Sequence, residues 1–270
     1  MDAARLKNIA IIILAALNVC FLILIGVNRF EVRNVSTNTK NSISELFADS
    51  GISLPAEIVP DKFDAAWYTI NRDTASEEKI VEKLIGQAEA EDQGGNIYSY
   101  TNGNGSAVFR NNGEFEVKLN FVDDGAGAGR TAARLLEEMD IAFISEGAEM
   151  EEHGDSRGIS YVCAWNENPV LNCSVHLTIY AGGSAVLSGR RINGVPQQGS
   201  AGKALDVNTV LVRFLDEIKS GGHVCNKVER IELCYNMSSA ASGAALEPVW
   251  HIVTDGGSYQ VNVSSGKIMN

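Results

Sequence analysis

One uninterrupted apolar run near the N-terminus constrains this chain more than any other feature. Residues 9–27 read IAIIILAALNVCFLILIGV, with no charged side chain and with Asn18 as the one strongly polar residue. A helix of this length would reach about 28 Å, close to the thickness of the hydrocarbon core of a bilayer. Apolar runs of cleaved signal peptides are shorter and end at a pair of small residues, which is absent here. The sequence therefore predicts an uncleaved transmembrane helix over residues 9–27.

The orientation of this helix follows from the segments on either side. Two basic residues precede the run and two follow it, so the count of Lys and Arg does not decide the orientation. Residues 1–8 form a very short flank, whereas almost the whole chain lies after the run. We expect a cytoplasmic tail, one span, and an extracytoplasmic body that is held at the cell membrane by contact between its anchor and lipid.

The composition indicates a folded and acidic body. Hydrophobic residues make up 45% and charged residues 21%, which is ordinary for a globular protein. Lys and Arg number 22 against 34 Asp and Glu, giving a net charge of −12 at pH 7. Because a protein with this charge is repelled by phosphate backbones, nucleic acid is excluded as a partner.

Proline, glycine and polar stretches divide the body. Residues 28–60 are polar and end at a proline, which indicates a stalk. Residues 61–155 and 156–270 each combine helical spacing with alternating, strand-like runs. The predicted fold class is α+β, with one N-terminal transmembrane helix followed by two units in which helices pack on antiparallel sheets.

Local patterns predict the elements of these units. The expected helices cover residues 42–48, 74–88, 131–139 and 205–218. The expected strands cover residues 97–100, 107–109, 115–121, 159–165, 171–180, 184–192, 228–235, 249–253 and 259–263. The acidic segment 149–155 is expected to be a solvated loop between the two units.

Motifs near the C-terminus carry a family resemblance. A strand VERIELCY at 228–235 is followed by LEPVWHIV at 246–253, YQVNV at 259–263 and SGKI at 265–268. This series resembles the C-terminal module of the YycI/YycH regulators and the wider PepSY-like group. Met1-Asp2 ahead of a single anchor is similar to the start of YycI, although Ala3 stands where that family commonly has Trp.

The resemblance implies PepSY/cystatin-like units and a non-enzymatic role. Such a protein would act, with a sister YycH-like membrane protein, on a sensor histidine kinase of a two-component system that controls cell-wall metabolism. An extracytoplasmic peptide-binding or protease-inhibitory PepSY-like module is the alternative. A membrane-anchored hydrolase is a third hypothesis, but the sequence contains no nucleophile–base motif that supports it.

Two residues of the expected span are candidates for contact with a partner helix. Asn18 is costly in lipid unless it is hydrogen-bonded, and such bonds between helices contribute about 0.5–2 kcal/mol. Ala15 lies about one turn away and would let a partner approach closely. Trapped water or the helix's own backbone could satisfy Asn18 instead.

The remaining candidates are cysteines and histidines. Outside the span there are four cysteines, which permit three pairings; local disulfides Cys163–Cys173 and Cys225–Cys234 are one expectation, and free buried thiols are the other. Since no C-x₂-C pair is present, a zinc site is not expected.

The histidines and a glycine-rich loop are expected to be structural. His176 and His251 fall in predicted strands, which favours hydrogen-bonded structural roles. His223 precedes Cys225 by two residues, which alone does not make a nucleophilic pair. The glycine-rich loop at 125–131 lacks the G-K-[ST] ending of a phosphate loop. The sequence predicts no catalytic, cofactor-binding or metal-binding residue.

Overall fold

The computed structural model describes residues 38–61, 65–122, 125, 127–199, 202–240 and 243–269. The expected span at residues 9–27 lies outside this part of the chain, and so do Ala15 and Asn18. The anchor and its helix contact therefore stay predictions. Within the described residues, none of the helices combines the length and the apolar character needed to span a bilayer.

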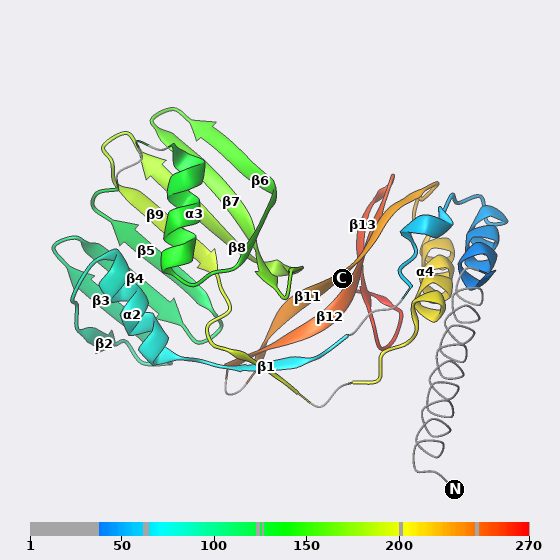
Figure 1. The fold of residues 1–270 in the computed structure, drawn as a ribbon, viewed down its shortest axis with the longest axis horizontal. Coiled ribbons are helices and arrows are strands. Elements are labelled where there is room, and N and C mark those ends of the chain that lie inside the picture. The colour runs from blue at the N-terminus through cyan, green and yellow to red at the C-terminus, as the bar shows by residue number, and fades with distance from the viewer. Residues whose placement is uncertain are drawn as a thin grey trace, which may run out of the picture. The chain divides into compact units, whose positions relative to one another are not determined.

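Fourteen strands of the described residues form one large mixed sheet (Figure 1). Ten of them follow the order β10-β1-β12-β11-β8-β9-β5-β4-β3-β2, while β6, β7, β13 and β14 branch from this path. The strands are β1 (Tyr68–Asn71), β2 (Ala90–Asp92), β3 (Ile97–Asn102), β4 (Gly105–Arg110), β5 (Glu114–Leu119), β6 (Phe143–His153), β7 (Ser156–Trp165), β8 (Asn168–Tyr180), β9 (Ala185–Arg190), β10 (Pro196–Gln198), β11 (Val228–Ala240), β12 (Gly243–Thr254), β13 (Gly257–Asn262) and β14 (Ile268–Met269).

Residues 74–190 repeat one arrangement, a helix followed by four strands. Helix α2 (Thr74–Leu84) precedes β2–β5, and helix α3 (Ala128–Glu138) precedes β6–β9. In each set, consecutive strands pair antiparallel. The last strands of the two sets, β5 and β9, then pair with each other, from Glu114 opposite Arg190 to Leu119 opposite Ala185. The two sets therefore share one eight-stranded antiparallel segment of the sheet.

Both helices lie on the same face of this eight-stranded segment (Figure 1). Helix α2 begins at Asp73, whose carboxylate accepts a hydrogen bond from the Ser76 backbone N–H at 3.0 Å. Its apolar residues recur at helical spacing and pack against every second residue of the strands. The buried core so formed includes Ile80, Val81, Tyr100, Phe109, Phe115, Val117, Leu135, Leu136, Met139, Val175, Leu177 and Leu187.

The sheet continues from β8 to β11 through a single parallel bridge between Val170 and Tyr235. The Asn172 side chain supports this junction, since it accepts from the Met237 N–H at 2.7 Å and donates to the Met237 carbonyl at 2.9 Å. Arg190 donates to the same carbonyl at 2.8 Å. Side chains thus replace the backbone ladder where the two parts of the sheet meet.

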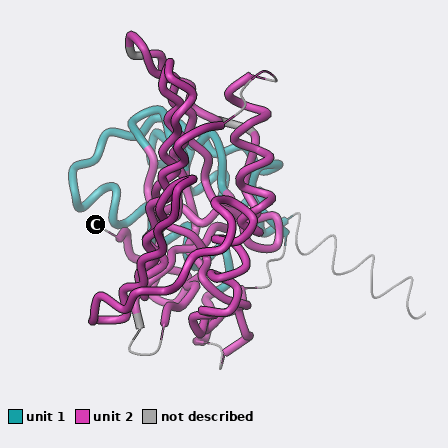
Figure 2. The backbone as a smooth tube through the Cα atoms, turned by 90° about the vertical axis from the view of Figure 1, so that its left-hand side faces the viewer, with its two compact units in different colours: residues 1–62, 206–231, 253–257 teal, residues 63–205, 232–252, 258–270 magenta. Residues whose placement is uncertain are grey.

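The chain divides into two compact units, shown in teal and magenta in Figure 2. The smaller one comprises residues 1–62, 206–231 and 253–257. It contains the helical residues 38–48, the short 3₁₀ helix η1 (Ala56–Ile58) and helix α4 (Val207–Gly221). Ser53 bridges to Lys227, and the Asp255 carboxylate accepts from the Asn226 N–H at 2.9 Å. Buried apolar residues of this unit include Ile43, Phe47, Leu54, Val210, Leu211, Phe214, Leu215 and Ile218.

The predicted fold class is wrong. Two helix-plus-antiparallel-sheet units are expected from the sequence, but the strands form one large mixed sheet that both expected units supply. The expected break at 155–156 falls in the turn between β6 and β7, inside a hairpin. The pairing of β5 with β9 joins segments far apart in the sequence, and local periodicity contains no information about such pairing.

The acidic segment 149–155 is also corrected. Residues through His153 belong to β6, so Glu149, Glu151 and Glu152 are strand residues opposite β7 instead of loop residues. Glu149 and Glu152 are exposed. Exposed charges on an edge strand hinder pairing with another chain, which gives this acidic run a structural reason.

Candidate functional site

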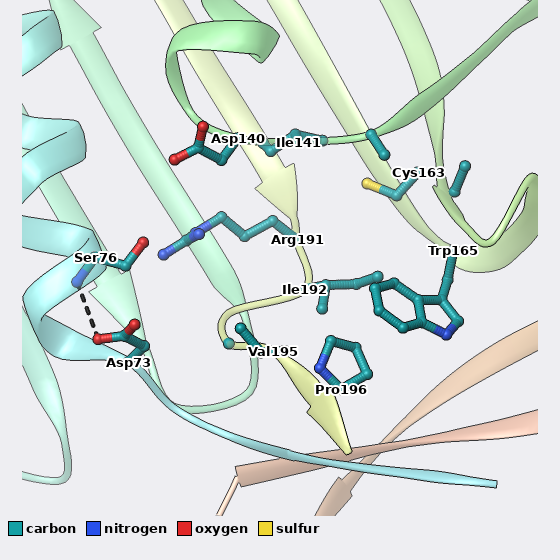
Figure 3. A pocket seen from close by; sticks show the side chains of 13 residues that line it. Asp73, Ser76, Asp140, Ile141, Cys163, Trp165, Arg191, Ile192, Val195 and Pro196 are labelled. Carbon is teal, nitrogen blue, oxygen red and sulfur yellow. Dashed lines mark hydrogen bonds between the residues drawn. The ribbon is translucent and has the colours of Figure 1, made fainter. Parts of the chain in front are cut away.

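A pocket of about 310 Å³ lies beside the start of α2 (Figure 3). Its polar lining includes Asp73, Ser76, Asp140 and Arg191, and its apolar lining includes Ile141, Trp165, Ile192, Val195 and Pro196. We call it the Arg191 pocket. In Figure 3 the guanidinium of Arg191 lies between Asp73 and Ser76 on one side and Asp140 on the other.

The backbone at Arg191 is fixed by the turn between β4 and β5. The Arg191 N–H donates to the Gly113 carbonyl at 3.0 Å. Gly113 has a φ of +84°, and a Cβ there would lie 2.4 Å from the Arg191 carbonyl oxygen, so only glycine fits. Asn-Gly is a dipeptide that favours tight hairpin turns, and here the Asn112-Gly113 turn fixes where this arginine leaves the sheet.

Arg191 belongs to a buried cluster of charges that we call the Glu77 cluster, made of Arg72, Glu77 and Arg191. Glu77, which is fully buried, accepts from Arg72 Nε at 2.9 Å and from Arg72 Nη2 at 2.7 Å. Arg191 Nη2 lies 3.7 Å from Glu77 Oε1, beyond hydrogen-bonding distance. Its side chain is only 5% exposed, and Nη2 has no hydrogen-bond partner among the described residues.

The Glu77 cluster therefore holds two positive charges and one negative charge. Burial lowers the pKa of Arg191 below its usual value; Glu77 opposes this effect and Arg72 adds to it. A guanidinium nevertheless stays protonated in proteins. The ring of Phe109, 5.3 Å from the Arg191 guanidinium carbon, offers a cation–π contact but no acceptor. A buried, unpaired N–H of a cation is costly, and an anionic ligand would remove that cost.

Two carboxylates stand near the mouth of the pocket and are already engaged. Asp73 caps α2 as described above, and its N–H donates to the Asn193 carbonyl at 2.9 Å. Asp140, whose side chain is 71% exposed, pairs with Lys83 at 3.7 Å. Because exposed charges are screened by water, these carboxylates balance the buried Arg191 only in part.

The apolar wall completes the chemistry of the pocket. Trp165 packs edge-on against Tyr68, with ring centroids 5.5 Å apart. Its Nε1 is buried and has no hydrogen-bond partner among the described residues. The Arg191 pocket thus combines a buried cationic donor with an apolar surface, which suits a ligand that carries one carboxylate beside an apolar group.

Two of the sequence-predicted residues come together next to this pocket. Cys163, which lines it, and Cys173 both donate to the Arg190 carbonyl, at 3.4 and 3.0 Å. The hydrogen bond with Cys163, and then burial, raises the pKa of the Cys173 thiol. Neither of these two cysteines forms a disulfide in the structure, and neither do Cys225 and Cys234. Cys163, Cys173 and Cys234 are buried and Cys225 is half-buried, and the two disulfide pairings stay predictions.

His176 and His251 lie in strands as expected, and each is hydrogen-bonded. His176 Nδ1 lies 2.6 Å from Ser160 Oγ, and His251 Nδ1 lies 2.8 Å from Glu232 Oε1. By contrast, the sequence patterns assigned no member of the Glu77 cluster to a functional site, and gave Glu77 only a place at the start of the helix expected from residue 74. The sequence signal for Arg191 was the pair Arg190-Arg191 at the end of an apolar strand, and such a pair is usually solvated.

Comparisons with known proteins give this chain no family. No protein-family model matches it, and no curated protein matches it. Among solved structures it is similar to the crystal structure of an uncharacterized protein from Eubacterium rectale ATCC 33656. The two are 13% identical with a TM-score of 0.49, and the match covers 77% of this chain and 86% of the other.

Proposed function

We propose that this chain is a membrane-anchored, non-enzymatic binding protein whose extracytoplasmic body holds a carboxylate-bearing peptide segment in the Arg191 pocket. The observation that carries the proposal is the buried side chain of Arg191, which lines a pocket of about 310 Å³ and whose Nη2 makes no hydrogen bond among the described residues, although it lies 3.7 Å from Glu77 Oε1. The anchor is the apolar run at residues 9–27.

The lining favours a carboxylate over a phosphate. Asp73 and Asp140 near the mouth repel a ligand that carries two negative charges more than one that carries a single charge. The volume lies at the lower end of the range for ligand pockets, which suits one or two residues of a peptide. A C-terminal residue with an apolar side chain offers both a carboxylate for Arg191 and a group for the wall at Trp165 and Ile192.

The test compares two forms of one peptide on the full-length protein in detergent micelles. Acetyl-Ala-Ala-Leu is titrated calorimetrically as the free acid and as the C-terminal amide. The free acid should bind at least about tenfold more tightly, because a hydrogen bond to a charged group contributes about 1.5–3 kcal/mol.

Two variants make the test specific. Arg191→Gln should abolish the preference for the acid. Arg134→Gln should keep it, because Arg134 is a half-exposed arginine on α3 that pairs with Glu138. Equal affinity of the wild type for both peptides, no binding of either peptide, or a retained preference in folded Arg191→Gln protein would contradict the proposal.

The resemblance supplies a second candidate function, regulation of a sensor histidine kinase together with a sister YycH-like protein. One observation favours it: the motif segments 228–235, 246–253 and 259–263 fall in β11, β12 and β13, which are consecutive neighbours in the sheet. A pull-down with the full-length protein, and with a form whose residues 9–27 are replaced by an unrelated span, tests this role. Recovery of a kinase with the full-length protein supports the role. Recovery with the form in which residues 9–27 are replaced then shows that the body makes the contact, and its loss shows that the helix does. If neither form recovers a kinase, the role is contradicted.

A further inference from the structure

Three side chains with metal-binding atoms meet on neighbouring strands outside the Arg191 pocket. Glu232 and Cys234 lie two residues apart on β11, and His251 lies on β12 (Figure 1). One ligand atom from each lies within 4.8 Å of the other two. Spacing by two residues places Glu232 and Cys234 on the same face of the strand, and His251 reaches them from the adjacent strand.

We propose that Glu232, Cys234 and His251 form a zinc site, which is independent of the function proposed for the Arg191 pocket. A thiolate, an imidazole and a carboxylate are the three ligand types that Zn²⁺ takes in proteins. In tetrahedral geometry such ligand atoms stand about 3.3–3.6 Å apart, as follows from their usual bond lengths to zinc. The separations here are compatible with that spacing after small side-chain movements.

The burial of the three residues defines how an ion would enter. Cys234 is fully buried, whereas the side chains of Glu232 and His251 are 31% and 17% exposed. The ion would therefore approach from the side of Glu232 and His251. The pair would separate from its present hydrogen-bond distance of 2.8 Å as each side chain turned to the metal. Three protein ligands leave the fourth position to water or to a donor from a partner.

The same burial speaks against covalent catalysis by this group. A cysteine, a histidine and a carboxylate also make up a nucleophilic triad. A sulfur that attacks a carbonyl must be reachable by the substrate, and Cys234 has no exposed surface. A zinc ion is much smaller than a substrate and needs only an opening between Glu232 and His251 to reach the Cys234 sulfur.

Binding would release protons in a balanced step. The Cys234 thiol loses its proton as the S–Zn bond forms, and that proton passes to solvent. His251 binds as the neutral imidazole and Glu232 as the carboxylate. No electron is transferred, and affinity should fall as the pH is lowered because protons compete with the metal.

The test uses the full-length protein, reduced and freed of metal with a chelator. Zinc is titrated in competition with a chromophoric chelator, and Co²⁺ is used as a spectroscopic probe. We expect one zinc ion per chain and a Co²⁺ spectrum with a thiolate charge-transfer band and the intense visible bands of tetrahedral coordination. Cys234→Ser and His251→Gln should each weaken zinc binding more than about 100-fold, the upper range for loss of an outer partner.

Matched controls are Cys225→Ser and His223→Gln, which should bind zinc like the wild type. Glu232→Gln changes a partly exposed side chain and serves if Cys234→Ser does not fold. Any of three results would overturn the proposal. They are a wild-type Co²⁺ spectrum without a thiolate band, a wild-type protein that does not bind one zinc per chain, and unchanged zinc affinity in His251→Gln and Glu232→Gln.

Discussion

The two helix-plus-four-strand sets in residues 74–190 have the same architecture but different interiors. Asp73 and Gly127 stand at the N-caps of α2 and α3, and the backbone N–H groups four residues later, in Glu77 and Thr131, donate to their carbonyls. Both later side chains are buried. The first set thus places a carboxylate where the second places a hydroxyl. The fold requires only a helix at this position, so the Glu77 carboxylate is not needed to form it. We infer that this carboxylate is present because it binds the buried side chains of Arg72 and Arg191.

The largest predicted effect contrasts these two buried positions. Glu77→Gln leaves two guanidinium groups buried without a counter-charge, so the free energy of unfolding should fall by about 3–5 kcal/mol. Thr131→Val keeps the volume and removes only a hydroxyl, so the loss should stay within about 1 kcal/mol. Urea denaturation followed by tryptophan fluorescence measures both. Similar losses in the two variants would contradict the difference we draw between the two interiors.

The next prediction separates the two arginines of the Glu77 cluster. Arg72→Met removes the one side chain that, among the described residues, donates hydrogen bonds to the Glu77 carboxylate, and it should destabilise by about 3 kcal/mol. Arg191→Met leaves the Arg72–Glu77 pair intact and removes a buried cation that lies 3.7 Å from Glu77 without a hydrogen bond to it, so stability should stay equal or rise by about 1 kcal/mol. The same denaturation series applies. A loss in Arg191→Met as large as that in Arg72→Met would show that Arg191 has a structural role.

A smaller effect concerns the two helix starts. Asp73→Ala removes the side-chain acceptor for the Ser76 N–H and should cost about 1 kcal/mol. Gly127 offers no side-chain cap, but its φ of +91° favours glycine, so Gly127→Ala should cost about 1 kcal/mol for backbone reasons. Asp73→Asn keeps a side-chain oxygen that can accept from the Ser76 N–H, so it should keep most of the stability that Asp73→Ala loses. A loss in Asp73→Asn as large as that in Asp73→Ala would refute the capping role.

The smallest effect is a pH dependence at the start of α4, which belongs to neither set. The Thr209 hydroxyl, 2.5 Å from Asp206 Oδ2, is the main cause that lowers the pKa of Asp206. A carboxyl whose pKa is lower in the folded state adds stability above its unfolded pKa, and this stability is lost as the pH falls through the folded pKa. The advantage of the wild type over Asp206→Asn should therefore hold at neutral pH and vanish in acid. An advantage that persisted in strong acid would contradict this assignment.

Local elements of this fold could be predicted from the sequence, whereas the partners of those elements could not. Helix α4 ends at Gly221, close to the expected end at residue 218, since Gly222 adopts a left-handed conformation with φ +66°. The turns at Asn112-Gly113 and Asp255-Gly256 also fall between runs that were expected to be strands. By contrast, β5 and β9 are the last strands of the two sets, and they can pair only after both sets have formed. Local sequence patterns do not reveal this pairing, so the predicted fold class was wrong.

The two candidate sites could not be predicted from the sequence for a related reason. Glu77 and Arg191 are ordinary surface residue types, and only the tertiary structure buries them together. For zinc, the alternation of Glu232 and Cys234 on one strand was visible, but their proximity to His251 depends on the pairing of β11 with β12. A search for polar and sulfur-bearing residues spaced by two on predicted strands, followed by a histidine on the next strand, could have found it.

The smaller compact unit has a consequence for the order in which the protein is made. Its segments come from residues before 63, from 206–231 and from 253–257. At about 5–20 residues per second, a ribosome needs roughly 10–40 s to proceed from Phe47 to Gly257. Throughout that interval the apolar side chains of Ile43 and Phe47 have no finished partner surface, whereas residues 74–190 are complete well before it ends. Chaperones and proteases should therefore act on the newly synthesised chain first at the helical residues 38–48. Substitutions that destabilise α4 should lower the yield of folded protein before they change ligand binding.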